Sequence, residues 1–168
     1  MKKGLIVSLF LLVAAFASAQ TTIQVIPAVP VTAGQAACIG TYTGSVPGYV
    51  LCDNTAVSPA ASVGVYLSAG TPPTRGVRGS GTYATLALNG QVTVPIPVYG
   101  TVFSPGHLVG DIDGSGNLAD LGAPGTTSDI YALSYAGFAV SMNASLTQLT
   151  MVVQPGFVFD PPSPRRKP

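Results

Sequence analysis

The residues best suited to bind a metal ion lie in one glycine-rich stretch, residues 110–122, with the sequence GDIDGSGNLADLG. The stretch holds three of the six acidic residues of the chain, and all six are aspartates. Calcium takes oxygen ligands from alternate positions of short loops, and a glycine allows the sharp turn that follows them. Asp111, Asp113 and Ser115 stand at positions 1, 3 and 5 of such a loop, and Gly116 follows at position 6. The spacing is therefore that of a candidate calcium loop.

This stretch resembles the first half of the calcium loops of EF-hand and dockerin proteins. Position 12 of those loops is a bidentate carboxylate, but here it is glycine, and the nearest acidic substitute is at position 10. The resemblance implies a calcium ion held by Asp111, Asp113, Ser115, Asn117 and Asp120. The alternative is a polar turn in which aspartate and asparagine side chains bond to their own backbone. The sequence leaves both interpretations open.

Side chains that could carry out catalysis are scarce. His107 is the only histidine, and it lies four residues before Asp111. A serine nucleophile needs a histidine held between it and a carboxylate, and no GxSxG motif supports such a site. The two carboxylates of a glycosidase must face each other across a cleft, whereas Asp111 and Asp113 share one glycine-rich loop. We therefore expect a protein without enzymatic activity.

The charges of the chain argue against nucleic-acid binding. Residues 20–168 contain five basic residues and six aspartates, so their net charge is 5 − 6 = −1. Three of the five basic residues lie in the last four positions, which leaves Arg75 and Arg78 in the body of the chain. A nucleic-acid binder needs a basic face that neutralises phosphates. The turn Arg75–Gly81 fits either recognition of a carboxylated ligand or two solvated arginines.

The N-terminus has the features of a secretory signal peptide. Two lysines precede an apolar run over 4–16, and small residues at 17–19 form a cleavage site of the A-x-A type. We expect removal of residues 1–19 and no membrane span in the remaining chain, because no later apolar run is long enough. Cys38 and Cys52 should form one disulfide in an oxidising compartment. The expected location is the bacterial periplasm, the cell surface or the extracellular medium.

The rest of the sequence is typical of β-strands separated by turns, since Val, Thr, Ile and Tyr dominate its periodic stretches. Apolar alternation predicts strands over 22–31, 49–51, 62–68, 82–98, 129–141 and 145–153. Asn89-Gly90 is the preferred pair of a type I′ turn, so it predicts a hairpin within 82–98. The predicted fold class is all-β, an immunoglobulin-like antiparallel β-sandwich over 20–160. A disordered, proline-rich basic tail is expected at 161–168.

Several short motifs follow one another along residues 22–105. A long alternating N-terminal strand precedes the cysteines, and then come Ser68-Ala69-Gly70, the arginine–glycine turn, Tyr83 and Val98-Tyr99-Gly100. In this order the motifs resemble the spore coat protein U family of secreted bacterial β-domains, which is related to subunits of archaic chaperone–usher fimbriae. The resemblance implies an incomplete sandwich that a neighbouring subunit completes by donating its N-terminal strand. The donor residues would be Ile23, Val25, Pro27, Val29 and Val31.

Two functions follow from these features. The first is an exported, non-enzymatic structural or adhesive cell-surface protein, a fimbria-like subunit whose partner is itself or a related subunit. The second is a calcium-stabilised secreted binding module for a carbohydrate or another cell-wall ligand. For the N-terminal strand itself, the alternative to donation is the first strand of a self-contained sandwich. The short Cys38–Cys52 loop, the aspartate loop and the proline-rich tail are departures from the family pattern, and they bear on whether the protein polymerises.

Overall fold

The computed structural model describes residues 20–42, 46–53, 61–77, 79–96, 101–111, 114–124 and 132–159. The expected signal peptide, the expected tail and the Val98-Tyr99-Gly100 motif lie outside these residues. The described part contains nine strands, all paired antiparallel, and no helix. The predicted all-β class is therefore confirmed. Within the same part of the chain, there is no helix that could cross a membrane.

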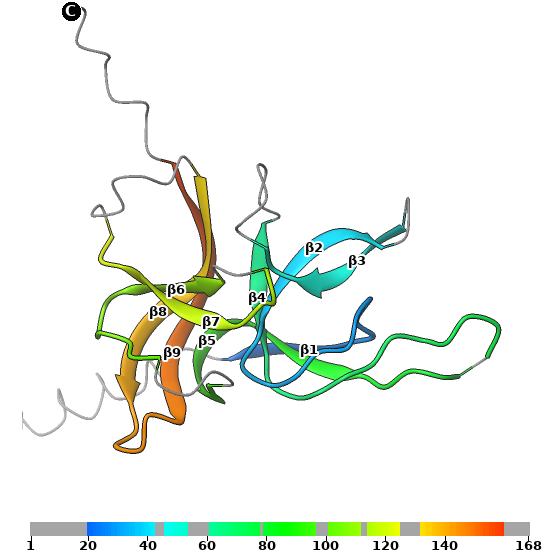
Figure 1. Ribbon diagram of the computed structural model, residues 1–168, viewed down its shortest axis with the longest axis horizontal. Helices are drawn as coiled ribbons and strands as arrows, with labels where there is room; N and C mark the ends of the chain where they lie inside the picture. Colours follow the sequence, from blue (N-terminus) through cyan, green and yellow to red (C-terminus); the bar gives the residue numbers. More distant parts are fainter. Residues whose placement is uncertain are drawn as a thin grey trace, which may run out of the picture.

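The strands follow one another as β1 (Thr21–Val25), β2 (Ala36–Tyr42), β3 (Val46–Leu51), β4 (Ser62–Tyr66), β5 (Ala84–Pro95), β6 (Leu108–Asp111), β7 (Leu118–Gly122), β8 (Ala132–Met142) and β9 (Gln148–Phe159). Hydrogen bonding connects them in the order β3-β2-β4-β5-β9-β8-β6-β7, and β1 pairs with β5 outside this path. The long strand β5 joins two half-sheets (Figure 1). Its first part pairs with β4 and β1, and its second part pairs with β9. Because β4 also packs against β8 and β9 without pairing with them, the half-sheets lie face to face as in a sandwich.

The hairpin predicted at Asn89-Gly90 is wrong, because β5 continues through both residues. The alternation of faces changes there: Leu86 packs in one buried cluster, whereas Val92 packs in another. Gly90 has a φ of 93°, which allows this change in the middle of a strand. The local preference of Asn-Gly for a turn is overridden because β1 and β9 supply pairing partners on either side of it.

Other strand boundaries also differ from the prediction. The N-terminal strand ends at Val25 instead of continuing to residue 31, and β9 extends to Phe159 instead of ending at 153. A turn at Asn143 joins β8 to β9, and there the Asn143 side-chain oxygen accepts the Thr147 N–H at 2.8 Å. The alternation of residue types therefore indicated β1, β3, β4, β5, β8 and β9, although not their lengths. The strands β2, β6 and β7 were not predicted.

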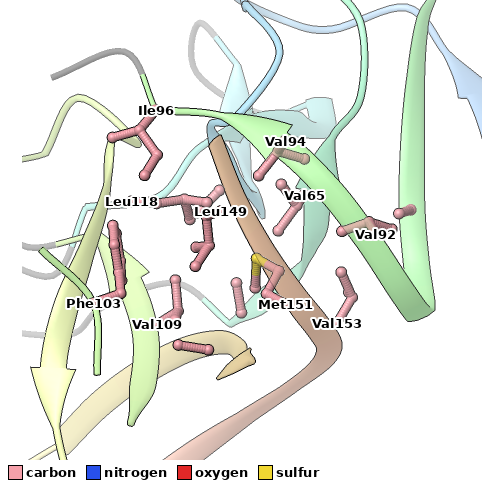
Figure 2. Close-up of a cluster of buried hydrophobic side chains, with 14 of the residues drawn as sticks. Val65, Val92, Val94, Ile96, Phe103, Val109, Leu118, Leu149, Met151 and Val153 are labelled. Carbon is pink, nitrogen blue, oxygen red and sulfur yellow. The ribbon is translucent and has the colours of Figure 1, made fainter. Parts of the chain in front are cut away.

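The main core lies between the two half-sheets (Figure 2). Val65 on β4 and Val94 on β5 meet Leu149 and Met151 on β9, and each of these four side chains is at most 1% exposed. The predicted disulfide between Cys38 and Cys52 is confirmed, and it is buried in this same cluster. Truncation of one large side chain here would cost about 2–5 kcal/mol, so this core holds the half-sheets together.

Candidate functional site

One half-sheet consists of β3, β2, β4 and the first part of β5. The N-terminal segment, residues 21–31, crosses this half-sheet, and we call the segment the strap. Its β1 part pairs with β5 alone, along the edge of the half-sheet. Further along, the Ala28 N–H donates to the Tyr49 carbonyl of β3 at 2.9 Å, and Val31 pairs with Gly70. The strap therefore contacts both edges of the half-sheet, but only its first five residues form a strand.

The strap buries alternate side chains, as the sequence predicted. Val25, Pro27 and Val31 are buried, and Ile23 and Val29 are half-buried. The residues between them are mostly exposed, with Ile26 at 41%. This alternation shows that one side of the strap faces the protein over its whole length, even where it is not a strand.

The surface beneath the strap is the side of the half-sheet that points away from the main core. We call it the covered face, and it consists of Ala37, Tyr66, Ala84 and Leu86. Their chain neighbours Ala36, Cys38, Val65 and Ala87 belong to the main core, as expected for alternate residues of a strand. All four residues of the covered face are fully buried, and Val25 and Val31 pack on them. Without the strap, this apolar surface would be open to water.

Tyr66 is the unusual residue of the covered face. Its side chain is fully buried, and its hydroxyl finds no hydrogen-bond partner among the described residues. Burial, with a smaller contribution from nearby Tyr49, raises the pKa of Tyr66 to about 12. An unsatisfied buried polar group costs about 1–3 kcal/mol. The strap therefore covers this face with one polar group left unsatisfied.

The aspartate loop fastens one half-sheet to the other. Asp111 ends β6, is fully buried, and its Oδ2 accepts the Gly114 N–H at 3.0 Å. The Ser115 carbonyl accepts from Gln35 Nε2 at 2.9 Å, and the Gly116 carbonyl accepts the Ala36 N–H at 2.7 Å. The loop thus bonds to its own backbone, as the polar-turn interpretation expects, and it also joins the start of β7 to the start of β2.

The candidate calcium ligands are only partly brought together. The Asn117 side chain donates to Ser115 Oγ at 2.9 Å, and Asp113 lies outside the described residues. Within the described ranges, no three His, Cys, Asp or Glu side chains gather closely enough to hold a metal ion. A residue that the sequence did not suggest lies nearby: the Asp53 carboxylate borders Gly114, with Oδ1 3.0 Å from the position of a Cβ added there. The only signal in the sequence was its place next to Cys52, because the disulfide brings that segment to the loop.

Asp120 does not complete the loop. Its carboxylate accepts the Ser104 N–H at 2.9 Å and the Gly122 N–H at 2.8 Å, and it lies 2.8 Å from Nδ1 of His107. Burial tends to raise the pKa of Asp120, but these hydrogen bonds and the histidine outweigh it and hold that pKa below its usual value. The expected neighbour of His107 was Asp111, and the structure pairs it with Asp120 instead. The cause is the β6–β7 register, which sets Asp120 opposite Val109.

No family model matches the chain, and no curated protein or solved structure matches it either. The class that the fold and this site define is an all-β, disulfide-bonded domain whose N-terminal strap covers one face of its own sheet. The resemblance to the spore coat protein U family stays a prediction.

Proposed function

We propose that the protein is an exported, non-enzymatic structural or adhesive subunit of the cell surface that assembles by strand addition. In the assembled state, the strap of one copy lies on the covered face of the next copy. The proposal rests on the strap. This N-terminal segment buries alternate side chains on an apolar face, and its one strand, β1, pairs only with β5. The export and the bacterial cell surface are parts of the proposal that come from the N-terminal sequence.

The chemistry of the strap suits exchange between copies. A second copy presents identical residues, so every contact that the strap makes with its own sheet can form between two subunits. Pro27 and Pro30 have no N–H to donate, which limits the hydrogen bonds that hold the strap after β1. In strand addition, main-chain hydrogen bonds give affinity and pockets for alternate side chains give specificity. Because few such bonds hold the strap after β1, burial of Val25, Pro27 and Val31 would carry a larger share of the affinity here.

The connection between the strap and β2 suits a hinge. Thr32 N–H donates to Gln35 Oε1 at 2.7 Å, and Gly34 adopts a φ of 85°. A few residues that absorb a backbone change are sufficient to release an attached segment. Besides the hydrogen bonds of the strap itself, this short turn and its Gly34 N–H bond to the Tyr66 carbonyl have to rearrange for the strap to leave the sheet. The strand β2 can stay in place, because β3 and β4 hold it separately.

The unsatisfied hydroxyl of Tyr66 is a further argument for exchange. A self-contained domain gains nothing from a buried phenol without a partner, since phenylalanine would fill the same space. The cost of the present packing then favours release of the strap.

A disulfide lock tests the proposal. Gln24 and Thr85 are direct cross-strand partners. The Cα atoms of such an antiparallel pair lie about 4.5–5.5 Å apart, which is within the Cα range of a disulfide. We expect the wild-type chain to form oligomers that resist detergent until boiled, and the oxidised Gln24→Cys, Thr85→Cys variant to stay monomeric. Reduction of the variant should restore assembly, which makes the same protein its own control. Monomeric wild type in every condition, with a periplasmic chaperone co-expressed, would refute the proposal.

The second candidate function is a calcium-stabilised secreted binding module, and the position of Asp53 favours it. Asp53, two residues after β3, borders Gly114 in the loop that begins at buried Asp111, so two carboxylates from different segments of the chain belong to one loop region. Oxygen ligands of this kind suit calcium. At a calcium concentration of about 100 Kd, binding should stabilise the fold by about 2.7 kcal/mol. An unchanged melting temperature between millimolar calcium and chelator, in wild type as in Asp53→Asn, would exclude this candidate.

A further inference from the structure

Two methionines of the described chain, Met142 and Met151, lie in different surroundings. Met151 on β9 is fully buried in the main core (Figure 2). Met142, the last residue of β8, is half-buried at the margin of that core. Peroxides oxidise a thioether to a sulfoxide, provided that they reach its sulfur. Of the two residues, Met142 is therefore the one that a peroxide meets in the folded protein.

The Met142 sulfur accepts a hydrogen bond from the backbone. The Phe103 N–H donates to Met142 Sδ, with 3.2 Å between nitrogen and sulfur. Phe103 belongs to residues 101–107, the segment before β6, and its side chain is only 5% exposed because it enters the main core. A thioether sulfur is a weak acceptor, and its second lone pair is not used by this bond. The sulfur thus joins the end of β8 to the point where the segment enters the core.

The later part of the same segment is fastened through oxygen acceptors. The Gly106 N–H donates to the Ala139 carbonyl at 2.8 Å, and the Ala139 N–H donates to the His107 carbonyl at 2.9 Å. The carboxylate–histidine contact described above ties the segment to β7 as well. A peroxide leaves all of these bonds unchanged. A modification at Met142 therefore acts on Phe103 first, and not on the segment as a whole.

We propose that Met142 is an oxidation site, at which hydrogen peroxide modifies the folded protein and releases the Phe103 backbone. A lone pair of Sδ attacks one oxygen of the peroxide, and the O–O bond breaks. That oxygen stays on the sulfur, its proton moves to the departing oxygen, and the products are the sulfoxide and water. The thioether is oxidised and the peroxide is reduced, so no further reactant is needed. The strap has no part in this chemistry, which is thus independent of subunit assembly.

Oxidation breaks the present hydrogen bond to Phe103, whichever lone pair reacts. An oxygen on the lone pair that faces Phe103 enters a gap of 3.2 Å, which is already a full donor–acceptor distance, so the backbone has to move. An oxygen on the other lone pair makes the sulfur the positive end of the S–O dipole, and the sulfur then no longer accepts. A polar, chiral sulfoxide also fits the close-packed margin of the core less well than the flexible thioether does.

Peptide mass spectrometry over a time course with hydrogen peroxide tests the site. We expect Met142 to gain one oxygen at least about tenfold faster than Met151 in the folded protein, and both to react at equal rates in denaturant. Once Met142 is oxidised, the Phe103 amide should exchange its hydrogen about fivefold faster, as the loss of one hydrogen bond predicts. Met142→Leu keeps the side-chain volume and should make this amide insensitive to peroxide. Met151→Leu is the matched control, in which the amide should still respond.

Three results would overturn the proposal. The first is equal oxidation of the two methionines in the folded protein. The second is an oxidised Met142 with unchanged hydrogen exchange at the Phe103 amide. The third is a Met142→Leu variant whose Phe103 amide still responds to peroxide. The first two measurements use the wild-type chain, so they decide the question even if Met142→Leu fails to fold.

Discussion

Asp120 and His107 show how one carboxylate can organise a loop. The carboxylate receives two backbone N–H groups and lies against the histidine ring, and it thereby ties residues 104–107 to β7. Nothing in the sequence connects His107 with Asp120 rather than with Asp111, since both are close in the chain. Only strand pairing decides which carboxylate points toward the histidine.

The lowered pKa of Asp120 predicts a pH dependence of stability. A carboxyl group with a lower pKa in the folded state stabilises the fold above its unfolded pKa, near 3.8, and loses this contribution as pH falls through the folded pKa. The free energy of unfolding should therefore decline below about pH 4. Asp120→Asn should flatten this decline, as measured by urea unfolding between pH 2 and about pH 6. Parallel pH curves for wild type and variant would contradict the assignment.

Tyr66 allows a prediction of the opposite sign. Tyr66→Phe removes the buried hydroxyl and keeps the ring, so the free energy of unfolding should rise by about 1–3 kcal/mol. Strap release should also slow, which hydrogen exchange at the β1 amides can measure. Tyr83→Phe is the control, because Tyr83 is 63% exposed and should change neither quantity. A destabilised Tyr66→Phe variant would show that the hydroxyl has a favourable role in the packed state.

At the scale of the element, β5 marks the limit of prediction from sequence. The alternation of Leu86 and Leu88, and later of Val92 and Val94, correctly predicted strand structure on both sides of Gly90. Whether Asn89-Gly90 reverses the chain depends on β1 and β9, which come from the two ends of the chain. Likewise, the aspartate spacing correctly indicated a tight polar loop, but not its contacts with Gln35 and Asp53. The sequence thus indicated which segments form strands and loops, but not the distant segments that they contact.

Gly90→Ala tests the continuous strand. The substitution places a Cβ at a positive φ, which costs about 1–2 kcal/mol, and this Cβ would lie 2.8 Å from the Gln20 Cα. We therefore expect a loss of stability together with faster hydrogen exchange at Thr21 and Ile23, because β1 must move away. Gly76→Ala is the matched control, since its φ is also positive but its Cβ meets no atom within 4 Å. Equal losses in both variants, with β1 exchange unchanged, would contradict this packing.

At the scale of the whole molecule, three features hold the half-sheets in register. The main core lies between them, β5 runs through both, and the aspartate loop fastens β7 to β2 at the side. Ala36 is the common point of this fastening, because its N–H donates to the Gly116 carbonyl and its carbonyl accepts from the Cys52 N–H at 3.1 Å. The disulfide, the loop and the first residue of β2 are thus one connected unit. The strap lies outside this unit, since it contacts the sheet through β1, Ala28 and Val31.

The connected unit predicts a local effect of removing the disulfide. Cys38→Ala with Cys52→Ala opens a crosslink with a sequence separation of 14, and the free energy of unfolding should fall by about 3 kcal/mol. Because Ala36 links Cys52 to Gly116, the amides of the aspartate loop should also lose hydrogen-exchange protection beyond the global change. Leu149→Ala is the control, since it should destabilise the protein by about 2–5 kcal/mol without a selective effect on the loop. Identical exchange patterns in the two variants, after correction for global stability, would mean that the loop holds the half-sheets independently of the disulfide.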